Sequence, residues 1–369
     1  MRRLLISAPL ALAAAIGAWA WAQSAAGAST LPARLTDQAF WQLVEQFSEP
    51  NGYFRSENLV SNEDLFQTVI PRLQNTIRRG GVYLGVGPDQ NFTYIAAVHP
   101  RMAFIPDIRR GNLLLHLMYK ALFEQSADRA EFLSRLFSRP RPPTLGPQTD
   151  VEAMFEAYAM VSPDRAQFES NLAAITDTLV ARHRFPLTTG DLAGLNRIYS
   201  AFYLEGPFLA YSSNGFSLRG RYPTYQDLQL ADDGTGTRRG YLATEANFRL
   251  IKHMQQQNLI VPLVGNFAGS RTIQAIGEYL ASHEATVGVF YTSNVEQYLF
   301  QDGLWHTFLR NVRSLPVDDR STFVRSCFNN CARPRGIRSR TLLDSMPLLL
   351  RDVRAGEVDS YGEVLARSR

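Results

Sequence analysis

The sequence predicts a mixed α/β protein with a mostly parallel sheet, helices on both faces and a helical insertion. Three observations lead to this fold class. Short apolar runs alternate with amphipathic stretches near both ends of the chain, the middle region has mainly helical periodicity, and a glycine turn joins the first predicted strand directly to a helix. Strands that alternate with helices are typical of a parallel sheet, because the crossover helices cover its faces.

The chain is long enough for more than one domain. Its 369 residues exceed the ~100–200 residues usual for one domain. We therefore expect either one large domain with an insertion or two domains. The predicted parts are a signal peptide at 1–28, N-terminal helices with the first half of the sheet at 29–127, a helical insertion at 128–230, and the second half with C-terminal helices at 231–369.

The N-terminus has the pattern of a signal peptide. Two arginines follow Met1, and the run at 4–22 is apolar. Cleavage patterns end at Ala22 and at Ala28, and both stay open; an uncleaved anchor is the alternative, since the run approaches the ~20 residues that span a bilayer. No later segment has ~18 uncharged apolar residues, so we expect an exported protein, periplasmic or secreted, whose mature chain does not span a membrane.

The elements up to residue 127 follow from apolar spacing and turn residues. Thr36 and Asp37 precede apolar residues at helical spacing, which predicts a helix at 36–48. Ser61 and Asp64 are spaced like a capping box, which predicts a helix at 61–79. The same criteria predict a strand at 82–84, a helix ending at 98, a strand at 102–105 and a helix at 111–123.

The middle of the chain reads as helix and its last third as α/β. The helices expected in the insertion are 128–138, 150–160, 164–182 and 189–203. The elements expected after it are helix 244–257, strand 259–264, helix 270–282, strand 286–291, helix 294–313, strand 322–327, and helices 342–354 and 359–367.

Candidate binding residues follow the strands. In a parallel sheet ligands bind beyond the carboxyl ends of the strands, where the glycine turn, Asp107, Asn266 and Tyr291 are expected to meet. Gly85 and Gly87 allow close approach of a ligand to the backbone, but Gln90 occupies the place of the third fingerprint glycine, which disfavours NAD. Asp107 suits the two hydroxyls of a ribose. The alternative is a packing turn followed by a helix-capping aspartate.

These segments resemble class I S-adenosylmethionine-dependent methyltransferases. Segment 83–90, YLGVGPDQ, is similar to their first cofactor motif, and segment 105–107, IPD, to their acidic second-strand motif. More narrowly, the segments SENLVSNE at 56–63, DIRR at 107–110 and YTSNVEQYL at 291–299 resemble an uncharacterised bacterial family of methyltransferase-like proteins. The resemblance implies a Rossmann-like fold that binds S-adenosylmethionine or a related adenosine ligand at Gly85, Gly87 and Asp107.

Other positions have two interpretations each. The segment 265–268, GNFA, stands where many methyltransferases have an Asp/Asn-Pro-Pro-Tyr motif, so Asn266 either orients a nucleophile or serves as a turn residue. The segment 51–63 is expected to fold over the ligand, with Asn58 and Glu57 as candidates. Ser293 and Asn294 either line the same cleft or cap the helix at 294–313, and capping is favoured.

The sequence therefore predicts an exported methyltransferase-like protein with an unknown acceptor and no assigned catalytic residue. The alternative is a non-catalytic exported binding or scaffold protein, because S-adenosylmethionine is a cytosolic metabolite. The six histidines lack metal-site spacing, and the serine-hydrolase elbow and the phosphate-binding loop motif are absent from the sequence.

The charge and the cysteine content indicate which classes of partner and metal site are expected. The net charge is +4, and the only lysines are Lys120 and Lys252. Arginine clusters at 135–141 and 333–340 lack a nucleic-acid motif, so solvated faces are expected and a nucleic-acid partner is not; a protein partner stays unknown. Cys327 and Cys331 are spaced for a local disulfide and make a poor zinc site.

Overall fold

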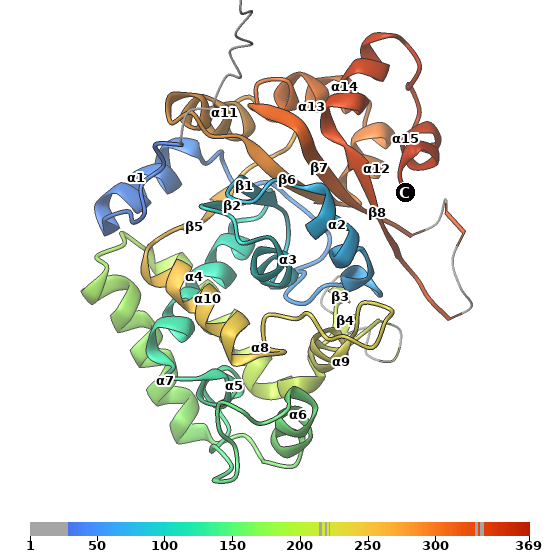
Figure 1. The fold of residues 1–369 in the computed structure, drawn as a ribbon. Helices are drawn as coiled ribbons and strands as arrows, with labels where there is room; N and C mark the ends of the chain where they lie inside the picture. The colour runs from blue at the N-terminus through green and yellow to red at the C-terminus, as the bar shows by residue number, and fades with distance from the viewer. Residues whose placement is uncertain (1–28, 214–215, 218–219, 221, 329–330, 333–335) are drawn as a thin grey trace, which may run out of the picture.

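The fold was analysed in a computed structural model of the chain (Figure 1). It describes residues 29–213, 216–217, 220, 222–328, 331–332 and 336–369. The predicted signal peptide at 1–28 lies outside the described residues. Within those ranges, no helix combines the length and the apolar character that crossing a bilayer requires.

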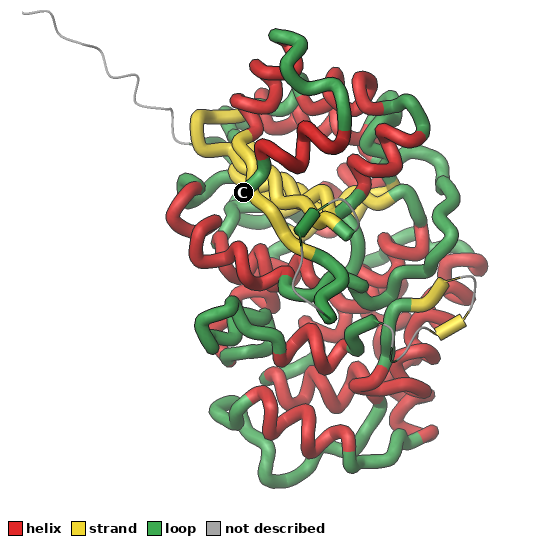
Figure 2. Tube along the Cα trace, turned by 90° about the vertical axis from the view of Figure 1, so that its right-hand side faces the viewer, coloured by secondary structure: helices red, strands yellow, loops and turns green. Residues whose placement is uncertain are grey.

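A six-stranded sheet runs through the middle of the molecule (Figure 2), which confirms the predicted α/β fold class. Its spatial order is β5-β2-β1-β6-β7-β8, the 3-2-1-4-5-6 order of a Rossmann-like sheet. The first five strands in this order are parallel, and β8 pairs antiparallel with β7. The strands are β1 (Val82–Gly85), β2 (Ala103–Asp107), β5 (Ile260–Val264), β6 (Val287–Ser293), β7 (Val317–Cys327) and β8 (Arg340–Ser345).

Helices cover both faces of the sheet (Figure 1). One face carries α2 (Ile70–Thr76), α3 (Gln90–Val98), α4 (Arg110–Gln125) and α10 (Glu245–Gln256). The other face carries α1 (Asp37–Phe47), α11 (Thr272–Ser282), α13 (Trp305–Val312) and α14 (Met346–Arg354), and α12 (Val295–Gln301) and α15 (Tyr361–Arg367) lie near β8. The apolar faces of these helices and the sheet form one continuous buried cluster.

The helices of the middle region lie together beyond α4 (Figure 1). They are α5 (Arg129–Phe137), α6 (Val151–Ala159), α7 (Arg165–Asp177), α8 (Thr189–Glu205) and α9 (Tyr225–Leu230), with the short turns η2 (Thr178–Arg182) and η3 (Gly206–Phe208) and the small hairpin β3 (Ser212–Ser213) and β4 (Phe216–Ser217). Their buried side chains belong to the same apolar cluster as the sheet. Arg139 of the first arginine cluster is buried and donates to the carbonyl of Tyr158, so the predicted solvated face is wrong there.

Four predicted boundaries are wrong. Residues 61–79 are not one helix: Leu65 has a φ of 52°, and a 3-10 turn, η1 (Phe66–Val69), precedes α2. The helix at 294–313 is two helices, separated at Gly303, whose φ is 69°. The last two differences concern strands, because β7 begins at Val317 and the first part of the helix expected at 342–354 is strand β8.

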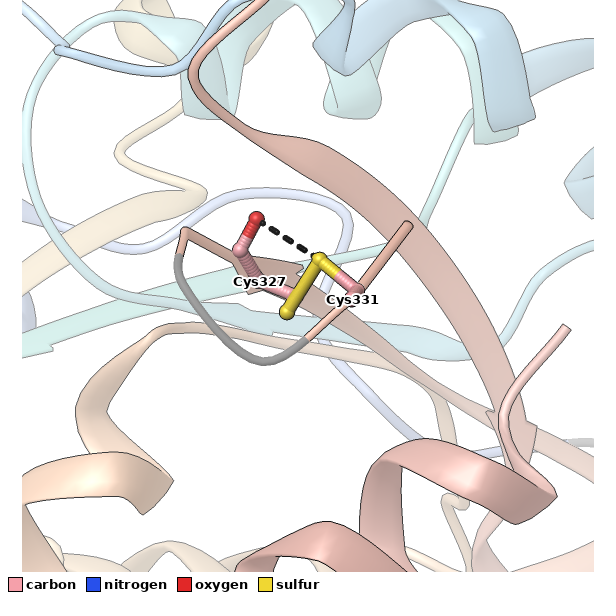
Figure 3. Close-up of a disulfide and its surroundings, with 2 residues drawn as sticks. All are labelled: Cys327 and Cys331. Atoms are coloured by element: carbon pink, nitrogen blue, oxygen red, sulfur yellow. Dashed lines mark hydrogen bonds between the residues drawn. A yellow bond between two sulfur atoms is a disulfide. The ribbon is translucent and has the colours of Figure 1, made fainter. Parts of the chain in front are cut away.

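The two cysteines are joined. Cys327 ends β7, and its sulfur is bonded to that of Cys331 (Figure 3). The Cys331 Sγ also lies 3.3 Å from the carbonyl oxygen of Cys327. The spacing that suggested a local disulfide is therefore realised at the end of the longest strand.

Candidate functional site

The parallel strands end on a cavity of about 220 Å³. It lies where the strand order reverses, between β1 and β6, which is the position at which open α/β sheets bind ligands. Five separate segments of the chain contribute residues to its wall. The wall residues that the sequence analysis selected as candidates are Asn58 before β1, Gly87 after β1, Asp107 at the end of β2, Asn266 after β5 and Ser293 at the end of β6.

The glycine turn has two different glycines. Gly87 lines the cavity with a φ of 84°, a conformation that side chains rarely adopt. Gly85 is not among the residues that line the cavity. A Cβ at Gly85 would overlap Asn91 Oδ1 and lie 2.6 Å from the hydroxyl of Tyr83. The Asn91 amide donates to the carbonyls of Val86, Gly87 and Pro88 at 2.7–3.1 Å. Gly85 is thus required by packing, and its predicted contact with a ligand is not seen in this geometry.

Asp107 is buried at the end of β2 and is bound by its neighbour Arg109. The Arg109 backbone N–H and Nε donate to Asp107 Oδ1 at 2.9 and 3.0 Å, and Nη2 lies 3.0 Å from Oδ2. The sequence predicts that Asp107 accepts hydrogen bonds from both hydroxyls of a ribose, and Arg109 takes up most of its acceptor sites here. A carboxylate has about four acceptor sites, so three bonds leave capacity for one more donor from the cavity.

Arg109 also fixes the segment before β1. Its Nη1 donates to the carbonyls of Ser56 and Glu57, which holds this segment over the end of β2. Asn58 follows in a left-handed conformation, with a φ of 53°, and lines the cavity. The side chain of Glu57 is exposed instead and lies 4.0 Å from Arg197. Of the two candidates in this segment, only Asn58 faces the cavity.

The sequence interpretation did not single out Glu63, a buried carboxylate on the cavity wall. It is 1% exposed and accepts hydrogen bonds from the hydroxyls of Tyr291, Ser293 and Ser326. Burial raises the pKa of Glu63 above its ordinary value, although these hydroxyls oppose the shift. Gln90 joins the network, because its Nε2 donates to the Tyr291 hydroxyl at 3.0 Å.

Two helix caps predicted in this region are absent. Ser61 accepts a hydrogen bond from the backbone N–H of Glu63 and does not begin a helix, because Leu65 in the left-handed region lies between Ser61 and the next helical turn. Ser293 has a φ of 52° and turns its hydroxyl to Glu63, while Asn294 makes no side-chain cap to α12. Both Ser293 and Asn294 line the cavity, so the interpretation of this pair as a helix cap is wrong.

Asn266 fits its turn interpretation. Its Oδ1 accepts from the N–H of Ala268 at 2.9 Å, and its own N–H donates to Glu49. The residue still lines the cavity. Asn266 therefore shapes the wall, and its amide oxygen takes part in the turn.

A second buried polar group lies behind the glycine turn. Asp89 begins α3 with its carboxylate fully enclosed, and it accepts from Tyr241 at 3.1 Å and Gln229 at 2.9 Å. Burial raises the pKa of Asp89 to about 7. His116 Nε2 lies 2.9 Å from the carbonyl of Gly87, and burial lowers the pKa of His116 to about 4. A neutral imidazole thus donates to the backbone of the turn.

Residues 58–185 and 211–339 match the family model described as "Domain of unknown function (DUF7790)", which is more than two thirds of the chain. The chain belongs to the DUF7790 family. The comparison with curated proteins gives no match. The matched ranges include the glycine turn, Asp107, Glu63 and the ends of β5 and β6, so the strand-end part of the cavity lies within the DUF7790 region.

The DUF7790 chain has a second, wider cavity beside the first, with a volume of about 610 Å³. The two share Tyr53, Phe54 and Arg109 in their walls. Much of the second cavity comes from residues 51–57 and 188–198, which lie outside the matched ranges. Helix α8 contributes its first turns here, and Asp191 of α8 binds Arg110 of α4 at 2.5 and 2.8 Å.

Alanine substitutions at two glycines of the DUF7790 chain are expected to separate strain from crowding. Gly80 and Gly87 share a φ of 84°, and a Cβ at Gly80 meets nothing within 4 Å. Gly80→Ala is therefore expected to lower the free energy of unfolding by about 1–2 kcal/mol through strain alone. Gly85→Ala is expected to lower it by up to about 3 kcal/mol, since Asn91 must move away. Urea denaturation measures both, and an equal loss at Gly80 and Gly85 would contradict the packing role.

Proposed function

We propose that this DUF7790 protein is exported, binds S-adenosylmethionine or a related adenosine ligand in the strand-end cavity, and is methyltransferase-like. The observation that carries the proposal is convergence: Gly87, Asp107, Asn58 and Asn266 come from four separate parts of the chain and line one cavity at the switch point of the sheet. Such a position is where dinucleotides and related ligands bind in folds of this strand order.

Asp107 suits the ribose in this proposal. Arg109 holds its carboxylate rigid through three hydrogen bonds, and one acceptor site remains for a ribose hydroxyl. The same guanidinium binds the carbonyls of Ser56 and Glu57. A hydroxyl bonded to Asp107 therefore meets a carboxylate whose position the covering segment already determines, and little conformational freedom is lost on binding.

The cavity mouth suits a flat aromatic base. Tyr53 is 83% exposed and lines both cavities, which is unusual for a large aromatic side chain. Phe54 and Tyr298 make an edge-to-face pair with ring centroids 5.6 Å apart beside it. Stacking on such rings supports binding of an adenine, because each planar base offers a face to an aromatic side chain.

The second cavity suits an acceptor molecule. It opens beside the first and shares Tyr53, Phe54 and Arg109 with it, so a group bound there lies next to the adenosine ligand. Helix α8 of the middle region forms one of its walls. Methyl transfer depends mainly on positioning of the two reactants, and this pair of cavities provides adjacent sites for them.

Calorimetric titration with S-adenosylmethionine and S-adenosylhomocysteine tests the proposal. Asp107→Asn is expected to weaken binding by about 1–3 kcal/mol, the scale of hydrogen bonds to a charged group. Asp302→Asn is the control, because Asp302 is an exposed carboxylate on the same cavity. Equal affinities of the Asp107 variant and the unaltered protein would remove the ribose assignment.

A methyl-transfer assay with the same protein separates an enzyme from a binding protein. Methyl transfer to an added acceptor fraction supports the enzyme. Binding without transfer supports the non-catalytic alternative, which agrees with the expected export away from the cytosolic supply of the metabolite.

Export has its own measurement: sequencing the protein from its host should find a mature N-terminus at Gln23 or Ser29, and an intact Met1 would contradict it.

A further inference from the structure

One end of the strand-end cavity gathers hydrogen-bond acceptors. Glu63, Gln90 and Asn58 all line it, and Glu63 and Gln90 are 1% and 4% exposed. Gln90 Oε1 and Asn58 Oδ1 are buried atoms with no hydrogen-bond partner among the described residues. Buried polar atoms are normally paired in folded proteins, so two unpaired oxygens in one cavity indicate a missing donor.

The orientation of the network explains why these oxygens are left over. The hydroxyls of Tyr291, Ser293 and Ser326 donate to the Glu63 carboxylate. The Tyr291 oxygen then accepts from Gln90 Nε2, which leaves Gln90 Oε1 as a free acceptor. Three donated hydrogen bonds also leave one of the roughly four acceptor sites of the carboxylate open.

The amide side chains of Gln90 and Asn58 lie close to one another around Gly87. A Cβ built on Gly87 would lie 3.3 Å from Gln90 Nε2 and 3.8 Å from Asn58 Nδ2, so both amides lie over the glycine. The Tyr291 hydroxyl links Gln90 to Glu63 through contacts of 3.0 and 2.6 Å. A small donor group at this end of the cavity therefore lies beside both amide side chains, and the Tyr291 hydroxyl connects this place to the carboxylate.

The charge of the wall favours a cation. The acidic residues among the described lining residues are Glu63, Asp107 and Asp302, and the basic one is Arg109. Arg109 is already bonded to Asp107 and to two backbone carbonyls. The negative charge of Glu63 consequently has no cationic partner at its end of the described cavity, where its bonds come from hydroxyls alone.

We infer that Glu63, Gln90 and Asn58 bind a primary ammonium group of the ligand. An ammonium has three N–H donors and a positive charge, which match the unpaired amide oxygens and the carboxylate. The inference rests on the proposed function: in S-adenosylmethionine and S-adenosylhomocysteine this group is the α-ammonium at the amino-acid end. Glu63 is then the residue that selects ligands with an amine over plain adenosines.

Three probes test this on the unaltered protein by calorimetry. They are S-adenosylhomocysteine, its decarboxylated analogue, which keeps the ammonium, and 5′-methylthioadenosine, which lacks both charged groups. The two amines are expected to bind about 10- to 100-fold more tightly than 5′-methylthioadenosine, the effect of charged hydrogen bonds. Glu63→Gln is expected to remove this preference and to leave 5′-methylthioadenosine binding unchanged, and Asn58→Ala to reduce the preference.

Each other outcome has a defined meaning. Equal affinity for all three probes overturns the ammonium site and leaves adenosine binding intact. Tighter binding of S-adenosylhomocysteine, with equal affinities for the other two probes, shows that the carboxylate and not the ammonium is recognised, which also overturns the inference. Failure of all three to bind overturns the inference together with the proposed function. Asp107→Asn is the matched variant, expected to weaken all three probes alike because they share the ribose.

Discussion

Replacing Arg325 with alanine is expected to lower the free energy of unfolding by about 3–5 kcal/mol, the cost of leaving a buried charge unpaired. Arg325 lies on β7 and has no exposed surface. Its guanidinium binds Glu296 of α12 at 2.6 and 3.0 Å, Asp344 of β8 at 2.9 Å, and the Ser368 hydroxyl at 2.7 Å. One side chain thus joins α12, β8 and Ser368 to β7. Its loss leaves Glu296 enclosed without a cationic partner, whereas Asp344 keeps its pair with Arg367.

Urea denaturation of a graded series measures this effect. Ser368→Ala removes one of the hydrogen bonds and is expected to cost about 1 kcal/mol. Arg165→Ala breaks the pair with Glu169, whose side chains are 70% and 61% exposed, and is expected to change stability by less than about 0.5 kcal/mol. A loss at Arg325 no larger than that at Arg165 would be incompatible with a structural ion cluster.

Asp89→Asn is expected to remove a large pH dependence of stability. The pKa of Asp89 is about 7 in the folded protein, raised by burial from an ordinary value of 3.8. Between these values the unfolded chain has lost a proton that the folded protein keeps, so stability falls as pH rises. The fall is about 1.4 kcal/mol per pH unit, or about 4 kcal/mol over the whole window. Above pH 7 both states are ionised and this contribution stays constant.

Unfolding free energies at pH 5 and pH 8 test the prediction. The Asp89→Asn protein should gain about 3 kcal/mol on the unaltered protein between these two pH values, because about two units of the window lie between them. Asparagine keeps the shape and the acceptor for Tyr241 and Gln229. Asp177→Asn on the exposed surface of α7 is the control for loss of one charge. A constant difference between the two proteins would disprove the buried titration.

The fold could be predicted to a large extent from local patterns. The strand, glycine turn and helix at 82–98 were recognised because their apolar spacing and turn residues are adjacent in the chain. Strand β8 was missed for a physical reason: Leu342 and Leu343 have helical spacing to Met346 and to residues 349–350 of α14, so the apolar pattern predicts one helix. Pairing with β7 decides that they are extended.

The candidate site was predicted in part. Gly87, Asp107, Asn58 and Asn266 were selected because they follow strands or precede the first one, and the structure brings them to one cavity. Gly85 was selected by the same motif, but its environment is the packing of Asn91. Glu63 lay within the segment expected to cover the ligand, and a lone acidic residue between polar neighbours offered no periodic signal that would single it out.

The sequence by itself determined the α/β class, the position of the glycine turn and the strand ends at which a ligand is expected. These depend on interactions between residues a few positions apart, so they are readable from spacing. Only the tertiary structure decided that Arg109 binds the carbonyl of Ser56, 53 positions away, and that Glu63 meets Ser293 and Ser326, which are 230 and 263 positions away. Partners of a buried charge are chosen by where the folded chain brings donors together, and that information is absent from local pattern.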